Sequence, residues 1–287
     1  MKPRVVVSLL TSQQEFQLMQ AADAESAGKR LGIQVEVAYA EGNAIQQIHQ
    51  LYSYIHAPAE QRPLAIVVEA VRNDGMERVA RNAAKAGIGW IVQQQGLDYV
   101  ATLLKEGWRV PIGAVAVDER EIGRIQARQV QALLPRGGSV LLLQGPPDSS
   151  TTIARRAGLE DTLKGSQVQL KGALHGDWTE PSARSAVASW LRLKTSEAMV
   201  VHLVASQNDS MAAGARKAIA ELRKDWVKVP YTGCDGLPEG GRRMVDAGEL
   251  VATIVKPTTT ERTVPPESLL QPSSYPALER LRAASPA

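Results

Sequence analysis

The sequence predicts an α/β protein of two lobes, each built on a parallel β-sheet with helices on both faces. Three observations predict this class. The chain has 287 residues, a length typical of about two domains. Its hydrophobic fraction of 44% is enough for packed cores and too high for a disordered chain. Short apolar, β-branched runs also alternate with segments of helical periodicity along most of its length.

The first half contains apolar runs separated by helical segments. We expect strands over residues 5–10, 35–38, 64–68 and 89–92, and helices over 16–31, 44–55 and 76–86. Gly32 and Gly87 stand where a glycine commonly ends a helix. Strands that alternate with helices in this way are typical of a parallel sheet.

A second, similar series follows the apolar run at 115–117. Its expected strands are 140–144, 167–173, 199–205, 229–233 and 250–255, and its expected helices are 120–134, 153–163, 182–193, 211–223 and 240–247. Pro181 is placed early in one of these helices, where proline is tolerated. The tail over 264–286 is rich in Pro, Ser and Ala, with one helix-like stretch at 275–283.

Composition excludes several classes of protein. Lys and Arg number 33 against 30 Asp and Glu, so the large basic excess of a nucleic-acid-binding protein is missing and we expect no nucleic-acid partner. The single cysteine, Cys234, excludes an internal disulfide and a thiolate zinc site. The four histidines have no paired spacing, so we expect no metal. No apolar run approaches the roughly 18 residues of a membrane span, so we expect no membrane insertion.

No catalytic motif is present. The sequence lacks GxSxG, and neither GxxxxGK[ST] nor GxGxxG follows the first expected strand. Residues 143–150 have the strand–loop–helix context of a phosphate site, but Pro146 and Pro147 remove backbone donors that a phosphate needs. We therefore expect no catalytic residues and no cofactor.

Polar residues follow the expected strands. In open parallel sheets, ligands bind beyond the carboxyl ends of the strands. The segments there are rich in amides and hydroxyls, carry both signs of charge and include aromatic rings, a set that suits a polyhydroxylated ligand. They are 11–16, 69–71, 93–95, 146–152, 176–178, 206–209 and 234–236.

Four segments in order carry a family resemblance: 141–145 followed by 155–159, then 206–215, 233–240 and 246–254. With them the chain resembles the type I periplasmic binding proteins of the ribose-binding kind, which also supply the effector domains of lac-repressor-type regulators. The resemblance implies two Rossmann-like lobes, three hinge crossings and a ligand enclosed on closure. The expected lobes are 1–117 plus 257–271 and 118–256 plus 272–287.

The resemblance also implies binding residues. Phe16 matches the family's aromatic on the first loop, where Gln14 and Glu15 compete for one further role. Gln94 stands where an acidic residue is frequent, and Lys256 stands where many relatives carry glutamine. The remaining matches are the sugar-binding arginine, the stacking aromatic, and the amide and carboxylate that hold hydroxyls, which are Arg155, Trp178, Asn208 and Asp235.

Each of these residues also has a structural alternative. Arg155 could pair with Glu160 or Asp161 on its own helix, and Asn208 could cap the helix that follows it. Trp178 could anchor a loop, and Asp235 before a glycine could belong to a turn. Trp90 is expected in the core, and Cys234 as a small buried apolar residue.

The departures from the family pattern leave the ligand class open among sugars, polyols, cyclitols and sugar acids. Gln94 replaces a charge, Lys256 adds one, and Cys234 stands where ribose binders often carry phenylalanine.

The resemblance implies a solute-binding protein that serves ABC-type uptake through a membrane permease. The alternatives are a ligand sensor coupled to a kinase or a transcriptional regulator, and, less favoured, an enzyme on the same fold. Residues 5–10 are too short for a secretion signal. The expected location is therefore the periplasm if a signal was removed, or the cytoplasm if Met1 is the native start.

Overall fold

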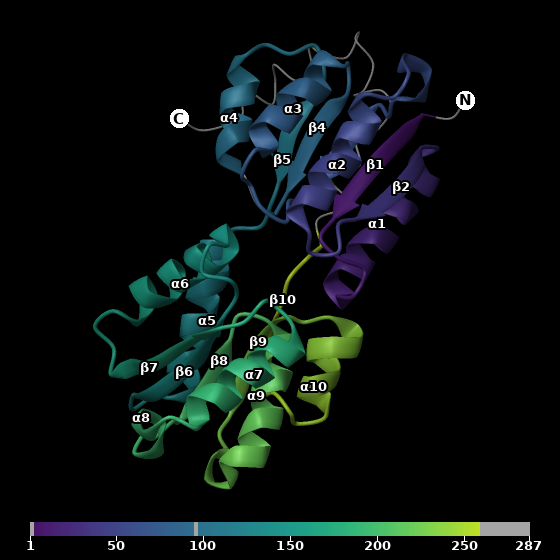
Figure 1. Cartoon of the computed structure of the whole chain (residues 1–287). Coiled ribbons are helices and arrows are strands. Elements are labelled where there is room, and N and C mark those ends of the chain that lie inside the picture. Colours follow the sequence, from purple (N-terminus) through teal and green to yellow (C-terminus); the bar gives the residue numbers. More distant parts are fainter. Residues whose placement is uncertain (1–2, 95–96, 259–287) are drawn as a thin grey trace. The chain divides into compact units, whose positions relative to one another are not determined.

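The computed structural model describes residues 3–94 and 97–258, which form two compact units. The described part of the first unit runs to Val117 and resumes at Thr258, and the second unit spans Asp118–Pro257. Each unit has its own sheet and its own helices (Figure 1). The helix-like stretch at 275–283 and the third expected crossing lie outside the described residues.

The first unit contains a five-stranded parallel sheet. Its strands are β1 (Arg4–Leu9), β2 (Gln34–Tyr39), β3 (Ala65–Val68), β4 (Gly89–Gln93) and β5 (Ile112–Val115), in the order β2-β1-β3-β4-β5. The helices are α1 (Glu15–Leu31), α2 (Ala44–Ile55), α3 (Met76–Lys85) and α4 (Leu97–Lys105), with a short 3₁₀ turn at Ala59–Gln61. The predicted α/β class and parallel arrangement are confirmed for this unit.

The apolar run at β1 reflects burial on both faces of its sheet. Val5 and Val7 pack with Ala24 of α1, whereas Val6 packs with Leu51 of α2 on the opposite face. Because both faces are covered, the successive residues Val5, Val6 and Val7 are all apolar instead of alternating with polar ones. Trp90 of β4 is fully buried in the same core as Val6 and Leu51, as predicted.

The second unit has a sheet with the corresponding topology. Its strands are β6 (Gly138–Gln144), β7 (Val168–His175), β8 (Leu203–Ser206), β9 (Tyr231–Asp235) and β10 (Ala252–Val255), in the order β10-β9-β8-β6-β7. All pairings between these strands are parallel. The helices are α5 (Glu119–Leu133), α6 (Ser150–Leu163), α7 (Glu180–Leu191), α8 (Lys194–Glu197), α9 (Asp209–Leu222) and α10 (Arg243–Asp246), and a 3₁₀ turn lies at Lys224–Trp226.

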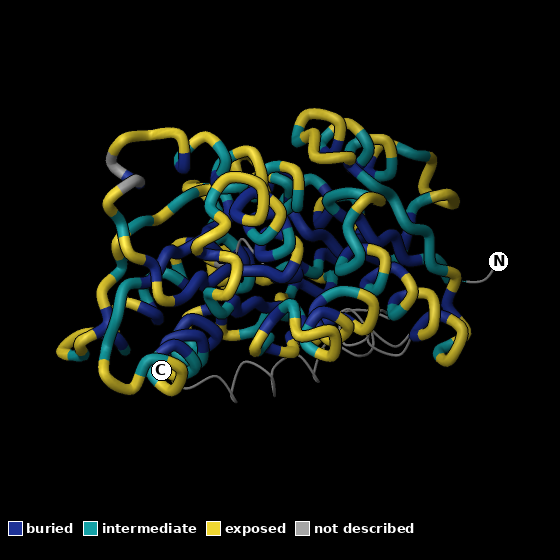
Figure 2. The backbone as a smooth tube through the Cα atoms, turned by 90° about the horizontal axis from the view of Figure 1, so that it is seen from below, coloured by how far each residue is buried: buried dark blue, intermediate teal, exposed yellow. Residues whose placement is uncertain are grey.

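Helices α5 and α6 cover one face of this sheet, and α7 and α9 cover the other. The two helices of each pair approach closely because glycines lie at the contacts. A Cβ atom on Gly123 of α5 would lie 2.0 Å from the carbonyl oxygen of Arg155, and one on Gly158 of α6 would lie 1.9 Å from that of Arg120. Figure 2 shows the burial of the described residues, with buried segments in the interior and exposed residues toward the outside.

Several elements differ in detail from what the sequence predicted. Strand β5 and helix α4 were not predicted, although Leu97, Val100 and Leu104 have helical spacing. The helix expected over 240–247 is a π-type turn, Pro238–Arg242, followed by the short α10, because Gly240 adopts non-helical torsion angles. Strand β8 begins at Leu203, later than expected. No helix among the described residues is both long enough and apolar enough to span a membrane.

Candidate functional site

Five of the predicted site residues lie in the second unit, at the carboxyl edge of its sheet or on the first turns of the helices that start there. Trp178 follows β7, Asn208 follows β8, Asp235 ends β9 and Lys256 follows β10. Arg155 lies in the second turn of α6, which follows β6. Because all strands are parallel, their carboxyl ends share one edge of the sheet, which is where ligands bind in open α/β folds.

The guanidinium of Arg155 is held from two directions. Its side chain is 2% exposed, its Nε donates a hydrogen bond of 2.6 Å to Oε2 of Glu119, and its Nη1 donates to the backbone oxygen of Gln207. Its Cζ lies 5.8 Å from the centroid of the Trp178 ring. Among the residues that the structure describes, none accepts a hydrogen bond from its Nη2.

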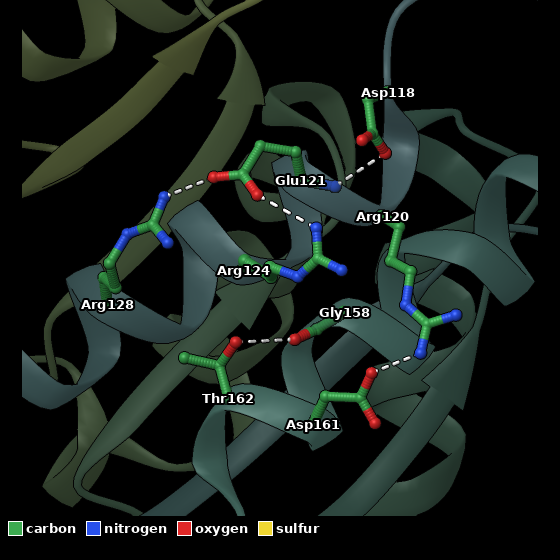
Figure 3. A network of polar contacts seen from close by, with 8 residues as sticks. All are labelled: Asp118, Arg120, Glu121, Arg124, Arg128, Gly158, Asp161 and Thr162. Carbon is green, nitrogen blue, oxygen red and sulfur yellow. Dashed lines mark hydrogen bonds and ion pairs between the residues drawn. The ribbon is translucent and has the colours of Figure 1, made fainter. Parts of the chain in front are cut away.

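The predicted alternative pairing of Arg155 with its own helix is wrong. Asp161 pairs with Arg120 of α5, and Glu160 pairs with Arg156. Figure 3 shows the surface network on α5 and α6, in which Glu121 contacts Arg124 at 3.0 Å and Arg128 at 2.6 Å. Glu160 and Asp161 therefore pair with other arginines, and Arg155 pairs with Glu119 instead.

Glu119 is a site residue that the sequence did not indicate. Its Oε1 lies 3.1 Å from Nζ of Lys256, so one buried carboxylate contacts both Arg155 and Lys256. Burial alone would raise the pKa of Glu119, but Arg155 and Lys256 more than offset this and hold the pKa below its usual value. Burial likewise opposes the charge on Arg155, yet Cys234, Glu119 and Asp235 raise its pKa. Both groups are therefore charged.

Trp178 and Asn208 are linked. Asn208 caps α9, since its Oδ1 accepts a hydrogen bond of 2.9 Å from the backbone N–H of Met211, which confirms the capping prediction. Its Nδ2 also donates to the backbone oxygen of Trp178 at 2.8 Å. The Trp178 ring lies over Gly145, where a Cβ atom would be only 2.1 Å from the ring. The cap thus positions the half-buried ring beside Arg155.

Asp209, which lies in one of the polar segments predicted to follow the strands, supports the loop that carries Asp235. Its carboxylate accepts a hydrogen bond of 2.6 Å from Thr253 Oγ1 and one of 2.8 Å from the backbone N–H of Gly236. A Cβ atom on Gly241 would lie 2.1 Å from this carboxylate, so the glycine leaves room for it. The sequence indicated Asp209 by its position after a strand, but not its hydrogen-bond partners.

Three predicted residues lie in the first unit. Gln14 occupies the N-cap position of α1 and Phe16 lies in its first turn, and both are half-buried. Gln94 follows β4 and is buried, with its Nε2 donating to the backbone oxygen of Thr258 at 3.0 Å.

A buried cluster supports the first loop. Glu69, after β3, accepts hydrogen bonds from Gln20 at 2.8 Å and Gln17 at 3.2 Å, and Gln17 accepts one of 2.8 Å from the backbone N–H of Leu10. The strand-end position had indicated Glu69, but nothing in the sequence indicated the two glutamines.

The backbone is unusual at the same positions. Among the described non-glycine residues, those with positive φ are Glu41 at 49°, Gln94 at 68°, Trp178 at 72° and Asp235 at 109°. Such conformations cost about 1–3 kcal/mol each and concentrate at functional sites. Three of these four residues are predicted site residues. The fourth, Glu41, holds the first loop by accepting hydrogen bonds from Thr11 Oγ1 at 3.0 Å and from the backbone of Ser12 at 3.3 Å.

Comparison with known proteins agrees with this geometry. A family model for a periplasmic binding protein domain matches residues 5–267. A putative rhizopine-binding protein of Rhizobium meliloti is 23% identical over 252 residues, which are 87% of this chain and 77% of the relative. A xylitol-binding protein of Mycolicibacterium smegmatis is 25% identical over 198 residues, 69% of this chain and 52% of the relative. The solved Caulobacter myo-inositol-binding protein has a TM-score of 0.76 and 23% identity, covering 99% of this chain and 88% of its own.

Proposed function

The chain belongs to the periplasmic binding protein domain family, and from this premise we propose that it binds a small polyhydroxylated solute and delivers it to an ABC-type membrane permease. The proposed ligand contacts come from Gln14, Phe16 and Gln94 of the first unit and from Arg155, Trp178, Asn208, Asp235 and Lys256 of the second. Ligand contacts with both units would favour the closed state of an open–closed equilibrium.

The observation that carries this proposal is the pairing of Arg155 with Trp178. The guanidinium is held by Glu119 and Gln207, and its Nη2 group has no hydrogen-bond partner among the described residues. It lies beside an aromatic ring whose backbone is fixed in a strained conformation. A fixed donor beside a ring suits a ligand that has hydroxyl groups at its edge and C–H groups on its face.

A neutral polyol or cyclitol is the ligand class that we favour over a sugar acid. In the second unit, the carboxylates of Glu119, Asp235 and the buried Asp209 accompany the cations Arg155 and Lys256, so there is no excess of positive charge. A carboxylate on the ligand would therefore be buried without a further cation to pair with it. The rhizopine-, xylitol- and myo-inositol-binding relatives support this choice.

We also infer that the protein binds its ligand without transforming it. The one cysteine, Cys234, is fully buried, and burial raises its pKa to about 12, so it is a poor nucleophile. The family membership supports a location outside the cytoplasmic membrane, which fractionation of cells that express the full-length gene would test.

Isothermal titration calorimetry against myo-inositol, xylitol, D-galactose, D-ribose and D-gluconate tests the proposal. We expect a neutral member of the panel to bind with a dissociation constant on the order of 1 μM, about −8 kcal/mol. Arg155→Met should weaken binding about 10–100-fold, because a charge-assisted hydrogen bond is worth about 1.5–3 kcal/mol. A folded protein that binds nothing in the panel would contradict the proposal, and preferred binding of gluconate would contradict the neutral class.

The matched control is Arg120→Met. Arg120 of α5 lies against α6, and its exposed side chain pairs with Asp161 of α6 on the surface. This variant should bind as the unmodified protein does. Equal losses in the two variants would show that loss of any arginine at these helices, and not of the Arg155 side chain in particular, is responsible.

A further inference from the structure

Glu119 joins two cations that belong to different parts of the second unit. Its Oε2 accepts the hydrogen bond from Arg155 Nε at 2.6 Å, and its Oε1 lies 3.1 Å from Lys256 Nζ. The three side chains are 2%, 7% and 8% exposed for Arg155, Glu119 and Lys256. A buried carboxylate shared in this way is the only group of the three that can keep the two cations together.

The members of this triad come from the places where the chain enters and leaves the unit. The unit spans Asp118–Pro257, so Glu119 is its second residue and Lys256 its second-last. Glu119 begins α5, and Lys256 directly follows β10. The ion pair therefore fastens the incoming segment to the outgoing one, and the third member, Arg155, extends the connection to the ligand site.

The triad also sets the direction of the Arg155 guanidinium. A planar guanidinium that donates from Nε to Glu119 and from Nη1 to Gln207 has its plane fixed, which fixes the direction in which Nη2 points. If the Glu119 charge were lost, two buried cations would face each other without a carboxylate between them. Arg155 would then lose the charge-assisted contact that helps to fix its orientation.

Resting on the proposed ligand-binding function, we propose that Glu119 is a positioning residue. Its carboxylate orients Arg155 toward the ligand and couples that orientation to the segments through which the chain enters and leaves the unit. Lys256 in this arrangement balances the charge of Glu119, in addition to the ligand contact proposed for it above.

Calorimetry with myo-inositol, or with the panel sugar that binds best, tests this role. Glu119→Gln keeps the shape of the side chain but removes its charge, and it should weaken binding about 10–100-fold, as misplacement of a binding group does. Adding Lys256→Gln removes the cation that Glu119 contacted, leaves an amide oxygen to accept from Arg155 and keeps a polar side chain for the ligand, so the double variant should recover part of the lost affinity. A merely structural residue would give no such rescue.

The matched control is Glu121→Gln, two residues along α5, whose carboxylate pairs with Arg124 and Arg128 on the surface. It should bind within about 2-fold of the unmodified protein, since surface pairs contribute little. Circular dichroism during urea unfolding confirms that each variant is folded at the titration temperature. Unchanged affinity in folded Glu119→Gln overturns the inference.

A second comparison covers the case in which Glu119→Gln does not fold. The variants E119Q/K256Q and E119A/K256Q have the same charge, but only the first retains an acceptor for Arg155 Nε. We expect the alanine variant to bind at least about 10-fold more weakly. Equal affinities overturn the inference. Failure of the unmodified protein to bind any panel sugar would instead contradict the proposed function itself.

Discussion

Three single residues at the strand ends have a strained backbone, and all three are predicted site residues. Gln94, Trp178 and Asp235 adopt positive φ without being glycines. Each is held there by contacts outside its own segment, as Trp178 is by Asn208. These positions could be predicted as site positions because they follow apolar runs. Their positive φ angles could not be predicted, because the angles depend on contacts that the local sequence does not reveal.

The thiol of Cys234 is expected to be inert in the folded protein. Burial raises its pKa to about 12, although Arg155 and Lys256 act in the opposite direction. Thiolate is the reactive form, so labelling by 5,5′-dithiobis(2-nitrobenzoate) at pH 8 should be negligible until the protein is unfolded. Guanidinium-unfolded protein, which should release one equivalent of thiolate, is the control. Rapid stoichiometric labelling of the native protein would show that the thiol is accessible.

Among the elements, the strands were the most predictable because their apolar runs record burial on both faces of a sheet. The helix break at Gly240 was not predictable, since glycine permits a helix as well as a break and its neighbours decide. Glu119 escaped prediction for a related reason. Its partner Arg155 is 36 residues away, and nothing around Glu119 distinguishes it from other acidic residues in the first turn of a helix.

The contact between α5 and α6 predicts an unusual effect of alanine. In a solvent-exposed helix, Gly→Ala stabilises by up to about 1 kcal/mol. At Gly123 and Gly158 the added Cβ would meet backbone oxygens at 2.0 and 1.9 Å, so the helices must separate. We expect each substitution to destabilise by about 1–3 kcal/mol, measured by urea unfolding.

Gly113→Ala in β5 provides the comparison for these two variants, because its nearest neighbour would be 3.6 Å away. It should change the unfolding midpoint little. If Gly123→Ala and Gly158→Ala behaved like Gly113→Ala, the close helix contact would be wrong.

At the scale of the whole molecule, the two sheets repeat one topology, and both place their polar strand ends at the carboxyl edge. The repeated order explains why one pattern of alternating runs was enough to predict both units. The polar groups near the strand ends differ between the two units. The first unit has the buried cluster of glutamines around Glu69, and the second has the triad of Glu119, Arg155 and Lys256.

The pH dependence of stability follows from the triad. The pKa of Glu119 in the folded protein lies below its unfolded value of 4.5. Its charge therefore stabilises the folded state above about pH 4.5, and this contribution is lost as the pH falls through the folded-state pKa. We expect the difference in unfolding free energy between the unmodified protein and Glu119→Gln to be constant near neutral pH and to shrink on acidification. A difference that stays constant down to pH 3 would contradict the assignment of charge to Glu119.

The chain path has a consequence for biosynthesis. Thr258 accepts a hydrogen bond from Gln94 and donates one to Asp23, so the first unit is completed by a residue that follows the entire second unit in sequence. A ribosome must therefore release all of residues 118–257 before the earliest-made part of the protein acquires this contact. A nascent chain truncated before Thr258 would carry every strand of both sheets and still have Gln94 without this anchor.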